Sequence, residues 1–83
     1  MLKLYGAHWC PHCVKAMAYL NKNNIKFDFV NMDTIDVDTE KKVIEANGGD
    51  DWIIPTLEFN GKWISGKKFD VNIFAADLKS LGV

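Results

Sequence analysis

The chain lacks the features that mark several specialised classes of protein. None of its apolar runs approaches the ~20 residues that a membrane-spanning helix needs. Its 10 basic residues are scattered and offset by 11 acidic ones, for a net charge of −1. This balance predicts no binding surface for nucleic acid or for an anionic membrane. It also lacks internal repeats, low-complexity tracts and linkers, so we expect residues 1–83 to form one domain.

Cysteine is scarce, and its placement is the most informative feature of the sequence. The only two cysteines, Cys10 and Cys13, enclose two residues in the run Cys-Pro-His-Cys. A disulfide across so short a loop would constrain little of the unfolded chain. A zinc site would need two more ligands, and only His8 and His12 are near, where one ion would be hard to enclose. The pair is therefore interpreted as a redox motif.

The start of the chain bears on where such a pair would work. An apolar strand is expected from residue 2, which leaves no room for a signal peptide, so a cytosolic location is expected. In a reducing cytosol, an isolated cysteine pair is more often catalytic than structural.

Apolar spacing and turn residues predict an alternation of strands and helices. The run Asn60-Gly61 is a strong signal for a hairpin, and Asp70 is expected to cap the last helix. The predicted order is β-α-β-α-β-β-α, an α/β fold with a four-stranded mixed sheet and helices on both faces. We expect strands over 2–6, 25–31, 56–59 and 62–65, and helices over about 11–23, 39–47 and from 71 onward.

The two cysteines are predicted to be unequal. Cys10 falls at the start of the first helix, where free N–H groups and the helix dipole stabilise a thiolate. Cys13, Met17 and Leu20 recur at helical spacing with Val14 beside them, which places Cys13 on the core face. Cys10 is expected at an exposed tip. Cys10 would thus attack a target disulfide, and Cys13 would resolve the mixed disulfide.

This element order, the Cys-Pro-His-Cys run and the Ile54-Pro55 step resemble the thioredoxin superfamily. Within it, the chain is most similar to the glutaredoxins and small glutaredoxin-like redoxins. The resemblance covers essentially the whole chain and implies a thioredoxin fold. It implies that Pro55 is cis and faces the cysteines, and that Ile54 offers its backbone to a substrate as a strand edge. A loop proline before a strand is the plainer alternative for Pro55.

Three further residues are candidates for substrate binding. Residues 60–66 are similar to the family's hairpin, which places Gly66 in the region that contacts substrate. Lys67 follows it and is either solvated or attracts the carboxylates of an acidic partner or of a glutathione-like thiol. Trp9 precedes Cys10 and is expected to lie in a loop beside the site, where it could form a contact surface for a partner protein.

Pro11 and His12 are candidates for tuning the Cys10 thiolate. Pro11 suits the first turn of a helix, where its missing N–H costs nothing. The imidazole of His12 is expected to favour the thiolate together with the helix N-terminus, and a more stable reduced form is a stronger oxidant. We therefore hypothesise a protein more oxidising than thioredoxin. An ordinary surface histidine is the alternative for His12.

The chain departs from the glutaredoxin pattern at positions that bind glutathione in the family. Ala7 replaces a lysine, His12 replaces a tyrosine, and Lys68-Phe69 replaces a pair of aspartates. We therefore expect a thiol-disulfide oxidoreductase that passes electrons to protein disulfides. A reductase protein is the expected donor, as in similar hybrids that serve ribonucleotide reductase.

Other functions remain as alternatives. One is a glutathione-dependent glutaredoxin with glutathione as co-substrate, and the other is a metal or iron–sulfur carrier that uses Cys10. No bound organic cofactor is expected, because the cysteine pair is itself the carrier, and a monomer is the expected state.

Overall fold

The computed structural model describes residues 1–83 and contains four strands and three helices. The hydrogen-bonded strands form one sheet in the order β2-β1-β3-β4. The elements are β1 (Leu2–Gly6), α1 (Pro11–Lys22), β2 (Phe27–Asn31), α2 (Val37–Ala46), β3 (Thr56–Phe59), β4 (Lys62–Ile64) and α3 (Val71–Leu81). This is the predicted element order, and the mixed sheet confirms the predicted α/β fold.

The sheet combines one parallel and two antiparallel pairs of strands. β1 runs parallel to β2, in a register that pairs Leu2 with Phe27 and Gly6 with Asn31. β3 pairs antiparallel with both β1 and β4, and the turn between β3 and β4 has positive φ angles at Asn60 and Gly61. β1 therefore lies in the interior of the sheet, and its C-terminal end leads directly toward the cysteines.

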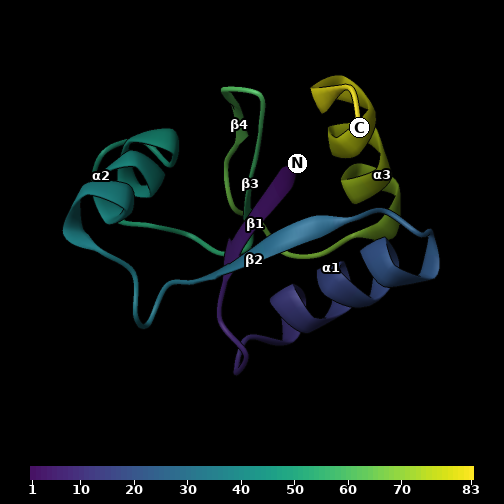
Figure 1. Cartoon of the computed structure of the whole chain (residues 1–83), viewed down its shortest axis with the longest axis horizontal. Helices are drawn as coiled ribbons and strands as arrows, with labels where there is room; N and C mark the ends of the chain where they lie inside the picture. The colour runs from purple at the N-terminus through teal and green to yellow at the C-terminus, as the bar shows by residue number, and fades with distance from the viewer.

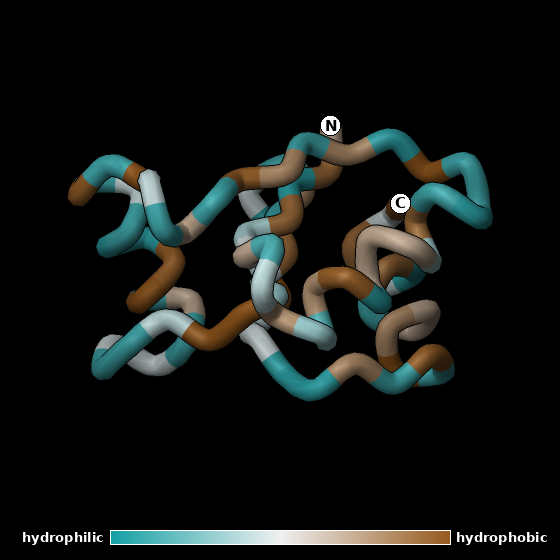
Figure 2. Tube along the Cα trace, turned by 90° about the horizontal axis from the view of Figure 1, so that it is seen from below, coloured by the Kyte–Doolittle hydropathy of each residue, from teal (hydrophilic) through white to brown (hydrophobic).

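The sheet separates two layers of helix, which Figure 1 shows with α1 and α3 on one side and α2 on the other. Alternate residues of β1 point to opposite faces, as strand geometry requires. Brown apolar segments alternate with teal polar ones along the chain in Figure 2. The larger core lies under α1 and α3 and contains Leu2, Leu4, Ala16, Leu20, Leu57, Phe74, Leu78 and Leu81. The smaller core lies under α2 and contains Tyr5, Met32 and Val43.

Two element boundaries differ by two residues from the sequence prediction, because local hydrogen bonds override the apolar pattern. α2 begins at Val37, two residues early, because the Thr39 N–H donates to the Asp36 carboxylate at 3.0 Å and caps the helix. β2 begins at Phe27 because the Ile25 N–H still donates to the Leu20 carbonyl of α1. No helix in the structure is both long and apolar enough to cross a membrane.

The buried face of α1 also differs from the sequence prediction at one position. Val14 was expected beside Cys13 on the core face, but it is 49% exposed. Leu20 is fully buried, as predicted, and so is Ala16, which the sequence pattern did not indicate. The buried positions of the helix are 13, 16 and 20, and the side chain at position 14 points about 100° away from that at 13, toward solvent.

Candidate active site

The end of β1 and the start of α1 position the two cysteines. Cys10 is the N-cap of α1 and has extended backbone angles, and its N–H donates to the Ala7 carbonyl at 3.2 Å. The Cys10 carbonyl accepts the Val14 N–H at 3.0 Å, which closes the first helical turn. Pro11 occupies the first helical position, as predicted. Cys10 thus stands at the positive end of the α1 dipole.

Cys10 is less accessible than the sequence indicated. We expected it at an exposed tip, yet it is only 6% exposed. It belongs to a small apolar cluster with Ala7 and Cys13, against which Met17 and Ile54 pack. Ala7 of the preceding loop and Ile54 of the turn before β3 belong to this packing, which no pattern within α1 could reveal. A target disulfide must therefore approach Cys10 in a defined direction.

Cys13 is fully buried beneath Cys10, as predicted. Burial is the largest cause that raises the pKa of the Cys13 thiol to about 12, and contact with the Cys10 sulfur adds to it. A hydrogen bond from the Ala7 backbone acts in the opposite direction. At neutral pH, the Cys13 thiol therefore keeps its proton as long as Cys10 is not bound in a disulfide.

Gly6 is a residue that sequence reasoning missed at this site. A Cβ atom at this position would lie 2.8 Å from the Cys13 sulfur and 3.3 Å from its Cβ. Only glycine lets the end of β1 approach the buried thiol so closely. The signal in the sequence was a glycine at the end of an apolar strand, four residues before the first cysteine.

The segment before β3 faces the cysteines across the site. The Ile54–Pro55 peptide bond is cis, as the resemblance implied, and Pro55 is buried. Ile54 packs against the cluster that holds Cys10. Neither its backbone N–H nor its carbonyl is hydrogen-bonded within the protein. Ile54 therefore presents an unpaired length of backbone beside the reactive sulfur.

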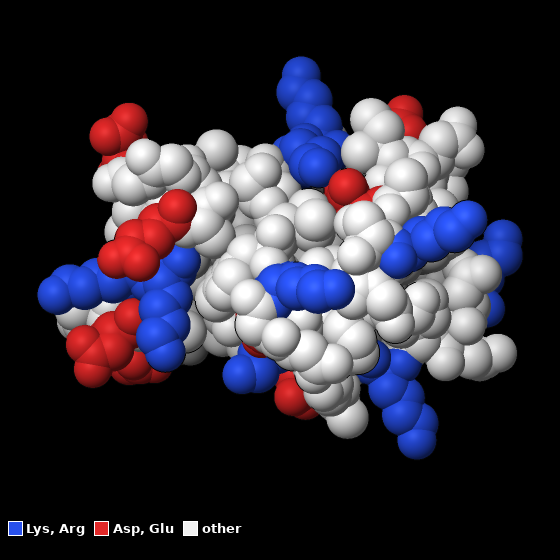
Figure 3. Space-filling view, turned by 90° about the horizontal axis from the view of Figure 1, so that it is seen from above, with Lys and Arg blue, Asp and Glu red and all other residues white.

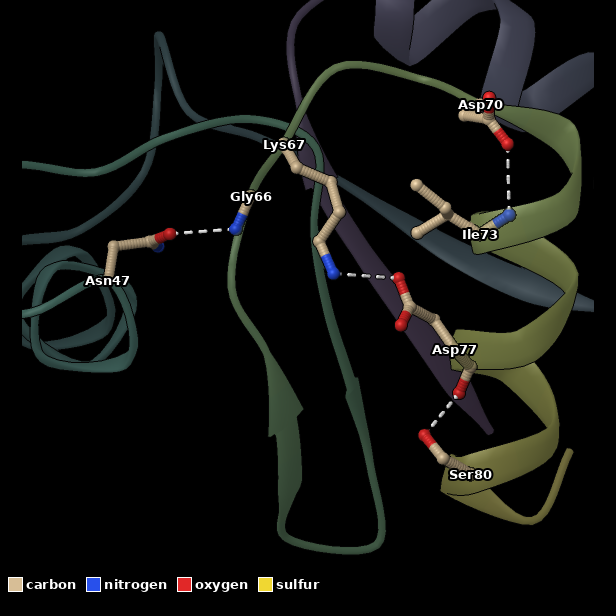
Figure 4. Close-up of polar contacts among 7 residues, drawn as sticks. All are labelled: Asn47, Gly66, Lys67, Asp70, Ile73, Asp77 and Ser80. Carbon is tan, nitrogen blue, oxygen red and sulfur yellow. Dashed lines mark hydrogen bonds and ion pairs between the residues drawn. The ribbon is translucent and has the colours of Figure 1, made fainter.

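The loop after β4 lies beside this segment and is fixed by a side chain that the sequence analysis did not single out. The Gly66 N–H donates to Asn47 Oδ1 at 2.7 Å (Figure 4). A Cβ at position 66 would lie 2.2 Å from the Ile53 carbonyl oxygen, so only glycine fits. The structure thus places Gly66 next to the turn that contains Ile54 and Pro55.

His12 connects α1 to the same loop. Its Nδ1 accepts the Phe69 N–H at 3.0 Å. Nδ1 is thus the acceptor atom of this imidazole, which leaves Nε2 as the ring nitrogen that can donate. This bond ties the cysteine helix to the segment before α3, a contact that joins residues 57 positions apart. The role of His12 in tuning Cys10 stays a prediction.

The remaining predicted residues are engaged in contacts of their own. Trp9 is 64% exposed, and its indole N–H donates to Asp33 at 2.8 Å. The Lys67 ammonium pairs with Asp77 of α3 at 2.9 Å, as Figure 4 shows. Trp63 of β4 stacks on Tyr5 of β1, with ring centroids 5.3 Å apart. The substrate-binding roles of Trp9 and Lys67 stay predictions.

Charge is distributed over the surface without a dominant sign. The face drawn in Figure 3 carries separated lysine and acidic side chains rather than a continuous basic area. The structure brings together no group of three or more His, Cys, Asp or Glu side chains that could hold a metal ion.

Comparison with known families identifies this architecture. The glutaredoxin family model matches residues 2–64, which include the cysteine pair, the Ile54-Pro55 turn and most of the hairpin. The chain therefore belongs to the glutaredoxin family, as the sequence analysis expected. No curated protein matches its sequence.

Solved structures show the same fold at low sequence identity. The thioredoxin-like protein BC3987 superposes with a TM-score of 0.70 at 19% identity, over 98% of this chain and 99% of that one. A glutaredoxin from Archaeoglobus fulgidus superposes with a TM-score of 0.68 at 21% identity, over 96% of this chain and 83% of that one. An arsenate reductase-related protein from Brucella melitensis has a TM-score of 0.65 at 17% identity, over 94% of each chain. These likenesses confirm the thioredoxin-like fold.

The tuning role of His12 can be measured through the reduction potential of the cysteine pair. We expect His12→Tyr to lower the potential by roughly 30 mV, a tenfold change in equilibrium constant, because the reduced form loses a stabilising group. Equilibration of both proteins in glutathione redox buffers gives the two values. An unchanged potential would reject the tuning role and leave His12 as a link to Phe69 alone.

Proposed function

We propose that this protein is a dithiol-disulfide oxidoreductase that reduces protein disulfides. The observation that carries the proposal is the pairing of an N-cap thiol, Cys10, with a fully buried protonated thiol, Cys13, beneath it. Family membership supports the same chemistry. The unpaired Ile54 backbone beside Cys10 supports an extended peptide as the substrate.

The first step is attack by the Cys10 thiolate on one sulfur of the target disulfide. A new S–S bond forms between Cys10 and the target, and the target's own S–S bond breaks. The second target sulfur leaves as a thiolate and takes a proton from solvent. The α1 N-terminus favours the attacking thiolate, and burial keeps Cys13 protonated so that only one thiol competes for the target.

The second step is resolution by Cys13. Once Cys10 is bound in a mixed disulfide, its sulfur carries no charge, and its part in raising the pKa of Cys13 is removed. Cys13 loses its proton to solvent and attacks the Cys10 sulfur, which releases the other target thiolate. The target gains two electrons and two protons in total, and the protein keeps a Cys10–Cys13 disulfide. A dithiol reductase, or two glutathione molecules, must then supply two electrons.

A reductase protein is the donor that we favour over glutathione. In the loop that binds glutathione in related proteins, two backbone N–H groups are already bonded, Gly66 to Asn47 and Phe69 to His12. The Lys67 ammonium is paired with Asp77, and the chain has no arginine. Few cationic or N–H groups therefore remain for the two glutathione carboxylates. A cytosolic location and a monomeric state stay part of the proposal.

The reaction predicts a stoichiometric exchange with a protein disulfide. Reduced protein mixed with insulin should lose two hydrogen atoms by intact mass as one insulin disulfide opens. Cys10→Ser should abolish the exchange, because the attacking sulfur is gone. Unchanged insulin in the presence of fully reduced wild-type protein would contradict the proposed function.

The choice of donor predicts how Cys13→Ser reacts with oxidised glutathione. This variant can trap a mixed disulfide at Cys10 but cannot resolve it. We expect slow glutathione addition by intact mass, at least about tenfold slower than in a glutaredoxin control, because the carboxylate contacts are missing. Iodoacetamide labelling confirms that the thiol is reactive. Rapid stoichiometric addition would instead identify a working glutathione-dependent glutaredoxin.

A further inference from the structure

We propose that Asn47 is a positioning residue that holds the substrate-facing turn 53–55 and thereby favours extended peptide substrates over small disulfides. This inference rests on the proposed function and assigns a role to a residue outside the cysteine motif. Asn47 lies just after α2, on the opposite side of the sheet from α1. Its side chain reaches from the end of that helix to the start of β3 and to the loop after β4.

The amide of Asn47 makes three hydrogen bonds, two as donor and one as acceptor. Nδ2 donates to the Val43 carbonyl at 2.8 Å and to the Thr56 hydroxyl at 2.9 Å. Oδ1 accepts the Gly66 N–H at 2.7 Å. One side chain therefore joins α2, the start of β3 and the loop after β4, and it is partly buried, where such bonds are costly to lose.

The bonds continue from Asn47 into the turn itself. The Thr56 hydroxyl donates to the Ile53 carbonyl, and Thr56 is fully buried. A continuous series of hydrogen bonds thus runs from Gly66 through Asn47 and Thr56 to Ile53. Gly66 and Ile53, the two ends of this series, are also in close contact. These contacts form a closed ring that includes Ile53, and the ring holds the turn 53–55 in place.

The turn needs this support because its own backbone makes few hydrogen bonds that would fix its position. Ile54 makes no backbone hydrogen bond within the protein, and it packs against the cluster that contains Cys10. A peptide that pairs with Ile54 depends on where that backbone lies relative to the Cys10 sulfur. A displacement of about 1 Å at such a site can cost a large part of the rate. A small disulfide that touches only Cys10 does not depend on it.

Asn23 shows what an ordinary asparagine at a helix end does in this chain. It also follows its helix, α1, and its Nδ2 donates to the carbonyl of Tyr19, four residues earlier, at 2.9 Å. The Asn47–Val43 bond repeats this local cap. The bonds to Thr56 and Gly66 are additional, and only they connect Asn47 to the site. Asn23 is therefore a matched control.

The experiment compares two substrates for each variant in single-turnover assays that start from fully reduced protein, so that Cys10 and Cys13 supply the two electrons. One substrate is a peptide disulfide in an extended chain, and the other is 2-hydroxyethyl disulfide. We expect Asn47→Ala to lower the second-order rate constant for the peptide about tenfold, while the rate constant for 2-hydroxyethyl disulfide changes less than about twofold. Thr56→Val should also slow the reduction of the peptide selectively. Thr56→Ser keeps the hydroxyl and should behave like the wild type on both substrates.

The controls separate this inference from stability and from the proposed function. Asn23→Ala should lose only a local cap and leave both substrates unaffected. Equal losses on both substrates in Asn47→Ala, no loss on either, or the same peptide defect in Asn23→Ala would overturn the positioning role. Wild-type protein that reduces neither substrate would overturn the proposed function itself. If Asn47→Ala does not fold, the Thr56→Val and Thr56→Ser pair decides by the same criterion.

Discussion

The burial of the Cys13 thiol at the junction of β1 and α1 is the constraint on which the rest of the structure depends. β1 is the interior strand that ends at this point, and Gly6 lets its backbone meet the sulfur. Because Cys13 is enclosed, Cys10 is the thiol that remains at the helix end, next to the free N–H groups. The chemical difference between two identical side chains thus follows from their positions three residues apart on one helix.

Side chains hold the loops around the site in place. Three of them, from separate parts of the chain, do so through polar contacts. His12 of α1 accepts from Phe69, Trp9 donates to Asp33, and Asn47 joins Gly66 to Thr56. Each contact satisfies a group in a loop, where backbone alone would leave it free. The site is therefore built from a rigid sheet and several loops that are pinned individually.

The sequence was sufficient to predict the order of elements and the sheet, because the relevant signals are local. The Asn60-Gly61 turn, the Asp70 cap and the apolar spacing of α3 each act within a few residues. The cysteine pair was equally readable from spacing alone. The boundaries of β2 and α2 shifted by two residues where Ile25 and Asp36 formed hydrogen bonds that the apolar pattern does not encode.

The parts of the site that could not be predicted depend on contacts between distant residues. The cluster that encloses Cys10 includes a contact with Ile54, which lies 44 positions away in the chain. The acceptor role of His12 depends on where Phe69 falls in the fold. Asn47 gave only the signal of a residue before Gly48-Gly49 at a helix end. Such residues become visible only when the tertiary structure brings their partners together.

The most direct test of the central claim is an NMR titration of Cys13 in the reduced protein with ¹³Cβ-labelled cysteine. Burial raises the pKa of this thiol to about 12, so its proton is retained as the pH rises. The Cys13 Cβ signal should therefore keep its thiol position up to about pH 10, well beyond the range in which an ordinary thiol ionises. A Cys13 titration centred near the ordinary value of 9.0 would contradict the account. It would show that the two thiols are not separated by burial, and that the division into attacking and resolving cysteines has another origin.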